Sequence, residues 1–443
     1  MPHDDLPPNE LASYWLPFSA NRAFKVAPRM ISGAEGMHYL TPDGRRVLDA
    51  TSGLYCVNAG HCRAPIVEAI RAAAGRLDYA PAFQFGHPDV FRLASRLAML
   101  APGDLDHVFL ASSGSEAMDT ALKIAFAVHR ARGEAGRTLL IGRERGYHGV
   151  GLGGLAVGGI LNNRRVFAPL LPRADHLATT YDRKRQAFSV GEPEWGAELA
   201  DELLRLIAFH GAETIAAVVV EPVAGSTGCL PPPKGYLERL RKITAEHGIL
   251  LIFDEVITGF GRIGHAFAAE RYGVVPDMIA FAKGVTNGAA PLSGVLVRAG
   301  LHDALMNGPE HAIELFHGYT YSGHPLSVAA ALASLDLYRD ERLFERARAL
   351  EAPFAKAMMS LRGKPGVEDI RPIGLICGID LAGLPGAPGK LGLEATKRAF
   401  HDLDLYIRVG GDTLVVAPPL VITEEEIADL ASRIGRLCEA VRR

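Results

Sequence analysis

The stretch Ile249-Leu250-Leu251-Ile252-Phe253-Asp254-Glu255-Val256 decides the fold. Its run of five apolar residues predicts a strand buried on both faces, which is typical of a parallel sheet covered by helices. Two acids follow at the carboxyl end of this strand, and ligands of open α/β sheets bind at that edge. A second apolar run, Met278–Phe281, is followed in the same way by Lys283. One strand–helix–strand unit separates Asp254 from Lys283, so both side chains can reach one crevice.

Working outward from this stretch, short β-branched runs alternate with helical patterns, which indicates an α/β fold with a mostly parallel sheet. The other expected strands are Val108–Ala111, Thr138–Ile141, Ile215–Val220 and Gly294–Val297. The expected helices between them are Ser115–Arg132, Trp195–His210 and Lys234–His247.

The two ends of the chain have a different pattern, typical of a smaller α+β domain. Residues 35–50 contain a hairpin-like Pro42-Asp43-Gly44 turn. A long helical pattern runs from residue 326 to Leu361, and a closing helix is expected after Thr423, where Glu426 completes a capping box. Short strands are expected near Ile370–Asp380, at Tyr406–Val409 and at Thr413–Ala417. We therefore predict a large domain at 61–325 and a small domain assembled from residues 1–60 and 326–443.

Composition excludes several classes of protein. The net charge of −3 argues against a nucleic-acid binder, and the basic cluster Asp182-Arg183-Lys184-Arg185 is typical of a solvated turn. Five scattered cysteines suggest reduced thiols rather than disulfides. The start of the chain does not resemble a secretory signal, and the apolar runs are too short to cross a membrane. We expect a cytoplasmic protein without membrane or nucleic-acid partners.

An acid and an amine at neighbouring strand ends suit pyridoxal 5'-phosphate. This cofactor needs a lysine for its aldehyde and an acid for its pyridinium nitrogen, which makes the ring an electron sink. Lys283 and Asp254 are the candidates. A structural ion pair behind two strands is the alternative interpretation.

A third element, Ser113-Gly114-Ser115, follows an expected strand and begins an expected helix. A helix start offers free N–H groups and the positive end of the helix dipole, which suit a phosphate. Gly114 allows close approach and Ser115 can add a hydroxyl. Simple N-capping by serine explains the same pattern.

Tyr147 and His148 follow another expected strand, where they can lie beside a cofactor ring, although a lone aromatic is more often part of a core. The glycine run from Gly149 to Gly154 matches G-x-G-x-x-G, but it follows no strand directly and is too rich in glycine for a good helix. We therefore reject a dinucleotide site.

The histidines His311, His317 and His324 lack metal-ligand spacing, so no metal is expected. The hydrolase motif G-x-S-x-G is absent.

Taken together, these residues resemble the class III (omega) aminotransferases, which have the aspartate-aminotransferase type of fold (fold type I). Within that class the chain is most similar to β-alanine:pyruvate and other omega-amino acid:pyruvate transaminases. The resemblance runs nearly end to end and is carried by Trp15-Leu-Pro-Phe18, Val57-Asn-Ala-Gly-His61, Ser113-Gly-Ser-Glu116, Gly142-Arg-Glu-Arg-Gly-Tyr-His148, Val220-Glu-Pro-Val-Ala-Gly225, Phe253-Asp-Glu-Val-Ile-Thr-Gly-Phe-Gly261, Ala282-Lys-Gly284 and His317-Gly-Tyr-Thr-Tyr-Ser-Gly-His-Pro325.

The resemblance implies a role for each matching residue. Lys283 is expected to hold the cofactor as a Schiff base and to shuttle the proton, and Asp254 to pair with the pyridine nitrogen. The other expected cofactor contacts are Ser113, Gly114, Ser115, Tyr147, His148, Glu221, Val256 and, from the neighbouring subunit, Thr320. The expected substrate contacts are Phe18, Tyr55, Phe83 from the neighbouring subunit, and Arg408, which matches the mobile arginine that clamps a carboxylate. Tyr55 stands where the family usually has tryptophan, which puts the preferred amine donor in doubt.

The resemblance implies an enzyme that moves an amino group from an omega-amino acid or amine to pyruvate, as a homodimer or homotetramer. Other omega-amine donors, such as taurine or γ-aminobutyrate, remain open. An aminomutase of the glutamate-semialdehyde type and a non-catalytic cofactor-binding protein are the alternatives. An aminomutase needs no keto acid, and a non-catalytic protein has a cofactor spectrum that amines do not bleach.

Overall fold

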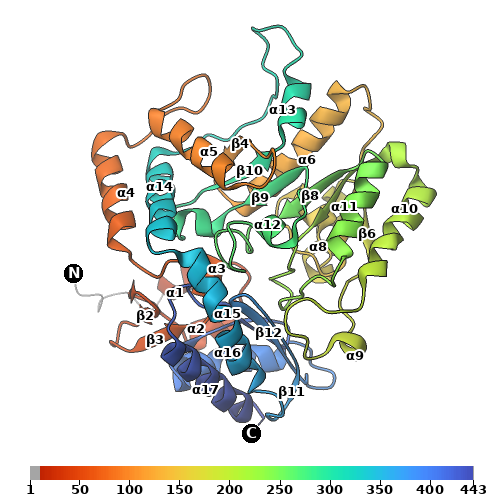
Figure 1. Cartoon of the computed structure of the whole chain (residues 1–443). Coiled ribbons are helices and arrows are strands. Elements are labelled where there is room, and N and C mark those ends of the chain that lie inside the picture. The colour runs from red at the N-terminus through yellow and green to blue at the C-terminus, as the bar shows by residue number, and fades with distance from the viewer. Residues whose placement is uncertain (1–9, 443) are drawn as a thin grey trace.

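A seven-stranded sheet forms the centre of the fold. The structure, a computed structural model, describes residues 10–442 (Figure 1). In spatial order the strands are β4 (His107–Ala111), β10 (Ser293–Val297), β9 (Met278–Phe281), β8 (Leu250–Asp254), β7 (Ile215–Val220), β5 (Leu139–Arg143) and β6 (Ala174–Leu177). Strand β10 runs antiparallel to both of its neighbours, and the remaining pairs are parallel. The predicted mostly parallel α/β fold is confirmed.

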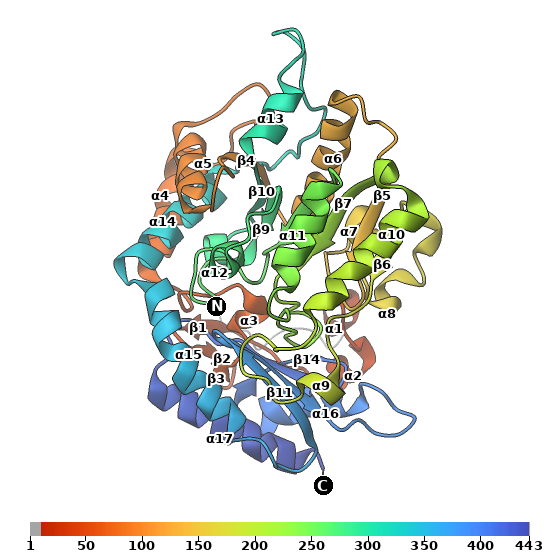
Figure 2. The ribbon, with the colours of Figure 1, turned by 45° about the vertical axis from the view of Figure 1, so that its right-hand side comes forward.

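Helices cover both faces of this sheet (Figures 1 and 2). Alternate residues of β8 lie in different apolar clusters: Ile252 packs with Met118 of α6 (Gly114–Ala131), and Phe253 packs with Leu240 of α11 (Tyr236–Glu246). Every residue of β7, β8 and β9 is buried, as the continuous apolar runs predict.

The remaining helices surround these layers or complete the ends of the chain. They are α1 (Glu10–Ser13), α2 (Asn21–Val26), α3 (Ser52–Tyr55), α4 (Ala64–Arg76), α5 (Pro88–Leu100), α7 (Leu152–Val157), α8 (Leu161–Arg164), α9 (Arg183–Gln186), α10 (Glu202–His210), α12 (Ala268–Tyr272), α13 (Ala299–Leu305), α14 (Pro325–Asp340), α15 (Leu343–Met359), α16 (Lys390–Asp402) and α17 (Glu424–Ala440). Four 3-10 turns are η1 (Ala168–Leu170), η2 (Ala197–Asp201), η3 (Ala212–Thr214) and η4 (Lys283–Thr286).

Two smaller sheets bring both ends of the chain together in the lower part of Figure 1. The first contains β1 (Gly33–Glu35), β2 (His38–Leu40), β3 (Arg46–Asp49) and β13 (Leu405–Tyr406), with β13 parallel to β3. The second is antiparallel and contains β11 (Val367–Ile373), β12 (Ile376–Leu381), β15 (Thr413–Val416) and β14 (Arg408–Gly410). The predicted domain boundaries near residues 60 and 325 stay a prediction.

The structure corrects three details of the predicted elements. The helical pattern that runs to Leu361 is two helices, because Arg342 between α14 and α15 has a left-handed φ of 51°. The expected strand Tyr406–Val409 is divided between two sheets at Ile407. A short helix, α7, forms in the glycine run where we expected none.

One prediction for the end of the chain is confirmed, because the capping box joins Thr423 and Glu426 at the start of α17. His324 caps α14. All five cysteines are free. Between residues 10 and 442, no helix is both long enough and apolar enough to cross a bilayer.

Candidate active site

A cavity of about 140 Å³ lies at the carboxyl ends of the central parallel strands. Asp254 ends β8, Lys283 follows β9, Glu221 follows β7, and Tyr147 follows β5. The residues that line the cavity are Gly114, Ser115, Tyr147, His148, Gly149, Glu221, Asp254, Val256, Ile257, Ala282 and Lys283. Eight of the predicted site residues therefore line one cavity at the sheet edge that the sequence indicated.

Asp254 is a buried acid held in a fixed orientation. Its Oδ2 lies 2.9 Å from His148 Nδ1, and the backbone N–H of Val256 donates to its Oδ1 over 3.1 Å. His148 is 1% exposed, and its Nε2 is buried without a hydrogen-bond partner among residues 10–442. A carboxylate supported from behind by a histidine is suited to face a positively charged ring nitrogen.

The adjacent acid, Glu255, faces away from the cavity. Its carboxylate accepts hydrogen bonds from Thr258 Oγ1 over 3.0 Å and from the backbone N–H groups of Ala268 and Ala269 at the start of α12. Burial raises the pKa of Glu255 to about 7. Of the two acids in the motif, the strand directs only Asp254 toward the cavity, because successive side chains alternate between faces.

Glu221 is the second acid of the cavity. Its Oε1 accepts from the N–H of Tyr147 over 2.9 Å, and its Oε2 accepts from the N–H of Gly225 over 3.0 Å. Burial raises the pKa of Glu221, while the nearby His148 lowers it and Asp254 raises it. Arg143 supports the same turn by donating from Nη2 to the Glu221 carbonyl over 2.7 Å. Glu221 thus ties the turn after β5 to the turn after β7.

Lys283 lies at a left-handed backbone position, with φ of 52°. Such a conformation is uncommon for a residue other than glycine and is found where a site imposes it. Burial lowers the pKa of Lys283, opposed by the nearby Cys56 and Asp254. A lowered pKa increases the fraction of neutral amine, which is the nucleophilic form.

The N-terminus of α6 closes another side of the cavity. A methyl group added at Gly114 would lie 3.1 Å from Val256 Cγ1, and one at Gly149 would lie 2.5 Å from Ser115 Oγ. The absence of side chains at both positions leaves room for a group at the helix start. Ser113, also predicted here, does not line the cavity: its hydroxyl caps α6 by accepting from the N–H of Glu116 over 3.2 Å.

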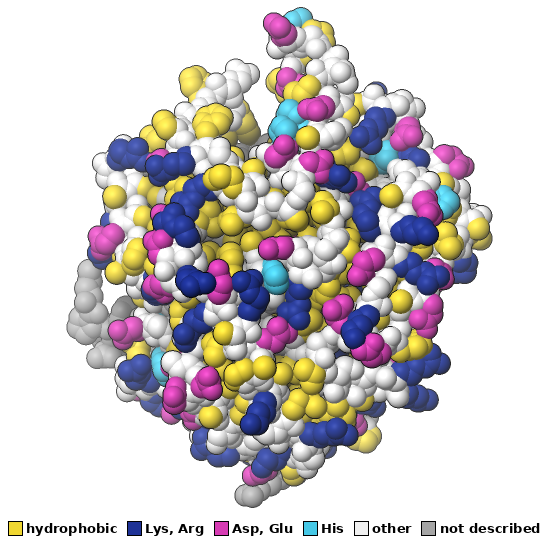
Figure 3. All heavy atoms as spheres, in the orientation of Figure 1, with side chains coloured by type: hydrophobic (Ala, Val, Ile, Leu, Met, Phe, Trp, Pro, Cys, Tyr) yellow, Lys and Arg dark blue, Asp and Glu magenta, His cyan; other side chains and the backbone are white. Residues whose placement is uncertain are grey.

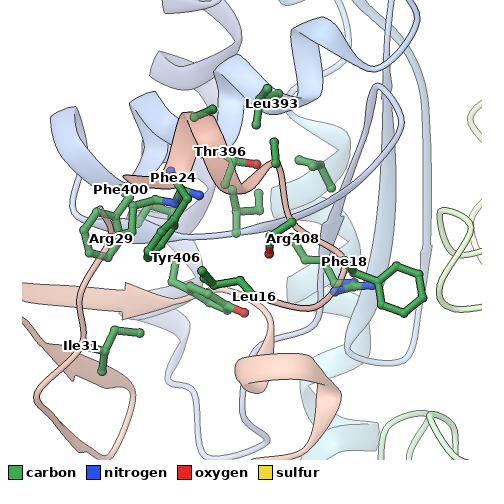
Figure 4. A pocket seen from close by; sticks show the side chains of 16 residues that line it. Leu16, Phe18, Phe24, Arg29, Ile31, Leu393, Thr396, Phe400, Tyr406 and Arg408 are labelled. Atoms are coloured by element: carbon green, nitrogen blue, oxygen red, sulfur yellow. The ribbon is translucent and has the colours of Figure 1, made fainter. Parts of the chain in front are cut away.

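Tyr55 and Arg408 lie next to this cavity. The Tyr55 ring is 2% exposed, and its centre is 5.9 Å from Lys283 Nζ and 5.9 Å from Arg408 Cζ. Phe18 lies beside Arg408 and is 75% exposed (Figure 4). The Arg408 guanidinium and the Lys283 amine therefore lie at the same distance from the centre of the Tyr55 ring.

Two predicted residues, Phe83 and Thr320, do not line the cavity of this chain. Phe83 is 57% exposed and Thr320 is also exposed. Phe83, but not Thr320, lines a separate groove of about 280 Å³, whose other walls include Phe85, Phe91 and Phe109. Both were predicted to act from a neighbouring subunit, and that prediction stands untested by a single chain.

Comparison with known proteins settles the family. A sequence model of the class-III aminotransferases matches residues 19–437. The chain belongs to the class-III aminotransferases. It is 55% identical to an omega-aminotransferase of Caulobacter vibrioides over 98% of both chains, and 46% identical to a β-alanine–pyruvate aminotransferase of Pseudomonas aeruginosa over 97% of this chain and 96% of that one. Its structure resembles that of an omega transaminase from Pseudomonas jessenii in complex with PMP, with a TM-score of 0.92, 29% identity and 98% coverage of both chains.

This aminotransferase is therefore an enzyme that depends on pyridoxal 5'-phosphate, and its cavity fits that group. One wall carries a lysine amine with a lowered pKa, another carries a buried carboxylate held by a histidine, and a third is a helix start without side chains. Across residues 10–442, no group of three or more histidine, cysteine or acidic side chains could hold a metal ion.

Sequence analysis missed several residues that shape the site. Gly149, Ile257 and Ala282 line the cavity, and Arg143 supports Glu221 from outside it. Gly149 has a φ of 90°, and the glycine run around it was the available signal. Arg143 gave no signal, because its contact depends on a residue 78 positions along the chain.

Proposed function

We propose that this aminotransferase moves an amino group from an omega-amino acid of the β-alanine type, or from an amine, to pyruvate. The products are L-alanine and an aldehyde or oxo acid. The observation that carries this proposal is the Arg408 guanidinium, placed one aromatic ring from Lys283 and without an ion-pair partner among the described residues. A planar guanidinium binds a carboxylate through two parallel hydrogen bonds, as a keto acid or an omega-amino acid requires. The names of the relatives agree with this substrate class.

Each residue of the cavity has a proposed task. Bound pyridoxal phosphate supplies an aldehyde for the amine and a ring that withdraws electrons from the substrate carbon. Lys283 Nζ would hold the cofactor through its aldehyde, and as a buried amine it could carry the proton that the reaction moves. Asp254 would pair with the ring nitrogen, and His148 keeps this carboxylate oriented.

The remaining contacts hold the ring and the phosphate. Tyr147 and Val256, which both line the cavity, would hold the ring between them, and Glu221 would lie near its phenolic oxygen. The proposed phosphate contacts are Gly114 and Ser115 at the start of α6 and Thr320 of the partner subunit, while Ser113 caps that helix.

We further propose a cytoplasmic homodimer, or a tetramer built from such dimers, with each site completed by Phe83 and Thr320 of the partner. Apolar side chains gather over the upper part of the face shown in Figure 3. Phe83, Phe85 and Phe91 are 57%, 73% and 68% exposed around the groove that Phe83 lines. Exposed apolar patches of this kind mark interaction surfaces.

The test of the proposed reaction is a panel of donors with and without pyruvate. We expect L-alanine to form from β-alanine and pyruvate, and no turnover without a keto acid. Turnover of an amino substrate without any keto acid would indicate an aminomutase instead. Failure to form L-alanine from every omega-amino acid would refute the proposed substrate class without affecting the family assignment.

A further inference from the structure

A groove of about 350 Å³ lies between the N-terminal segment, α16 and the strands that carry Arg408. Arg29 stands at one end of it, and Arg408 with Phe18 at the other (Figure 4). We name it the Arg29 groove. Its volume is at the lower end of the range of about 300–1,000 Å³ that is usual for small-molecule sites.

Arg29 is a cation without a partner among the described residues. Its Cζ lies 5.2 Å from the centre of the Phe24 ring, and its Nη1 is buried without a hydrogen bond. Burial lowers the pKa of Arg29, and no acidic residue between residues 10 and 442 opposes that effect. A half-buried guanidinium favours an anionic partner, because an uncompensated charge is costly to desolvate even in part.

The walls between the two arginines suit a hydrocarbon chain. They are mainly apolar, with Leu16, Phe24 and Phe400 among them and Tyr406 near the middle (Figure 4). None of the described residues that line the Arg29 groove is acidic. An apolar passage that ends in a lone guanidinium matches a methylene chain that ends in a carboxylate.

Arg408 connects this groove to the active site. It lines the Arg29 groove, and its Cζ lies 5.9 Å from the centre of the Tyr55 ring, which is also 5.9 Å from Lys283 Nζ. A short substrate places its carboxylate at Arg408. A longer chain that passes Arg408 enters the Arg29 groove.

We propose that Arg29 is a second carboxylate-binding residue, which recognises the carboxylate of long-chain omega-amino acids whose amine is at Lys283. This inference rests on the proposed omega-amino acid activity. Each methylene buried in the groove stabilises binding by about 0.8 kcal/mol. At 1.36 kcal/mol for each factor of ten, kcat/KM rises about fourfold per methylene until the carboxylate meets Arg29.

The kinetic test compares unbranched omega-amino acids of increasing length, with n-alkylamines of equal length as substrates without a carboxylate. For Arg29→Gln we expect the ratio of kcat/KM between the best long omega-amino acid and β-alanine to fall about tenfold or more, with no such fall along the alkylamine series. Arg22→Gln is the matched control, because Arg22 is an exposed arginine on the neighbouring α2 that does not line the groove. An unchanged ratio, or an equal loss for alkylamines, would overturn the proposal.

A binding measurement separates recognition from turnover. Octanoate carries a carboxylate on an apolar chain but no amine, so it binds the holoenzyme without reacting. Calorimetric titration should give a Kd that Arg29→Gln raises about tenfold and Arg22→Gln leaves unchanged. Equal octanoate affinity in all three proteins would overturn the role of Arg29. If β-alanine itself gave no L-alanine, the proposed function would fail separately, whatever the octanoate result.

Discussion

Removal of the Arg408 side chain should affect the two half-reactions differently. In the first the donor gives its amino group to the cofactor, and in the second the cofactor gives it to pyruvate. In the protein without substrate, no described residue forms an ion pair with Arg408, so Arg408→Ala leaves no carboxylate buried and unpaired. We therefore expect the free energy of unfolding to change by only about 0.5 kcal/mol, as for a substitution away from the core. The substrate carboxylate, in contrast, loses its partner when pyruvate binds.

The size of that loss follows from the exposure of the site. Truncation of one partner of a buried charge pair costs about 2–5 kcal/mol. Arg408 is half-buried, so water screens the pair, and we expect the lower part of that range, about 2–3 kcal/mol. At 1.36 kcal/mol per factor of ten, the pyruvate half-reaction should slow by about 30- to 160-fold in kcat/KM.

Stopped-flow absorbance measures the two half-reactions separately. The conversion of the cofactor by a simple alkylamine, which has no carboxylate, should be nearly unchanged in Arg408→Ala. Arg173→Ala is the control, since Arg173 is an exposed arginine outside the cavity and the Arg29 groove. Equal losses with alkylamine and pyruvate would show that Arg408 supports the structure rather than the carboxylate, and would refute the reasoning.

Four further predictions concern the lysine, the donor pocket and the assembly. Borohydride reduction followed by peptide mapping should find the cofactor on Lys283, and a label on any other lysine would disprove the assignment. Because burial lowers the Lys283 pKa below its ordinary value of 10.5, the unfolded chain binds more protons between those two values and stability rises with pH. In thermal melts of the cofactor-free protein, Lys283→Met should therefore have a higher melting temperature than the natural enzyme near neutral pH. This difference in melting temperature should close toward pH 10.5, and a difference that stays constant with pH would contradict the lowered pKa. Tyr55→Trp should shift the ratio of kcat/KM between β-alanine and a bulky aryl amine by about 1–3 kcal/mol, and an unchanged ratio would place Tyr55 outside the donor pocket. Sedimentation at the assay concentration should show a dimer or larger, whereas a fully active monomer would exclude sites shared between subunits.

Much of the central sheet was predictable because its strands are continuous apolar runs between turn residues. Strands β7, β8 and β9 are such runs, and their carboxyl ends located Asp254 and Lys283 before any contact was known. Strand β6 was missed, because it lies at the edge of the sheet and its Asp175 and His176 break the apolar pattern.

The site was predictable only where a local pattern carried the chemistry. A helix start with glycine and serine indicated the phosphate end of the site at Gly114, and the end of an expected strand indicated Tyr147. The family resemblance supplied Glu221 and Arg408. Contacts between distant segments were not predictable: His148 meets Asp254 across 106 positions of the chain. The lack of a hydrogen-bond partner for Arg29 Nη1 among residues 10–442 was equally hidden from the sequence, since it depends on how distant segments pack around it.

The pairing of β3 with β13 has a consequence for how the enzyme is made. Thr51, just after β3, accepts a hydrogen bond from the N–H of Arg408, which lies 357 positions later in the chain. At about 5–20 residues per second, a ribosome reaches Arg408 about 20–70 s after Thr51. During that interval the first three strands lack their last neighbour, and their exposed edge is open to wrong pairings and to chaperones. Arg408, the proposed carboxylate-binding residue, is thus among the last parts of the site to be synthesised, so a prematurely released chain carries Lys283 without Arg408.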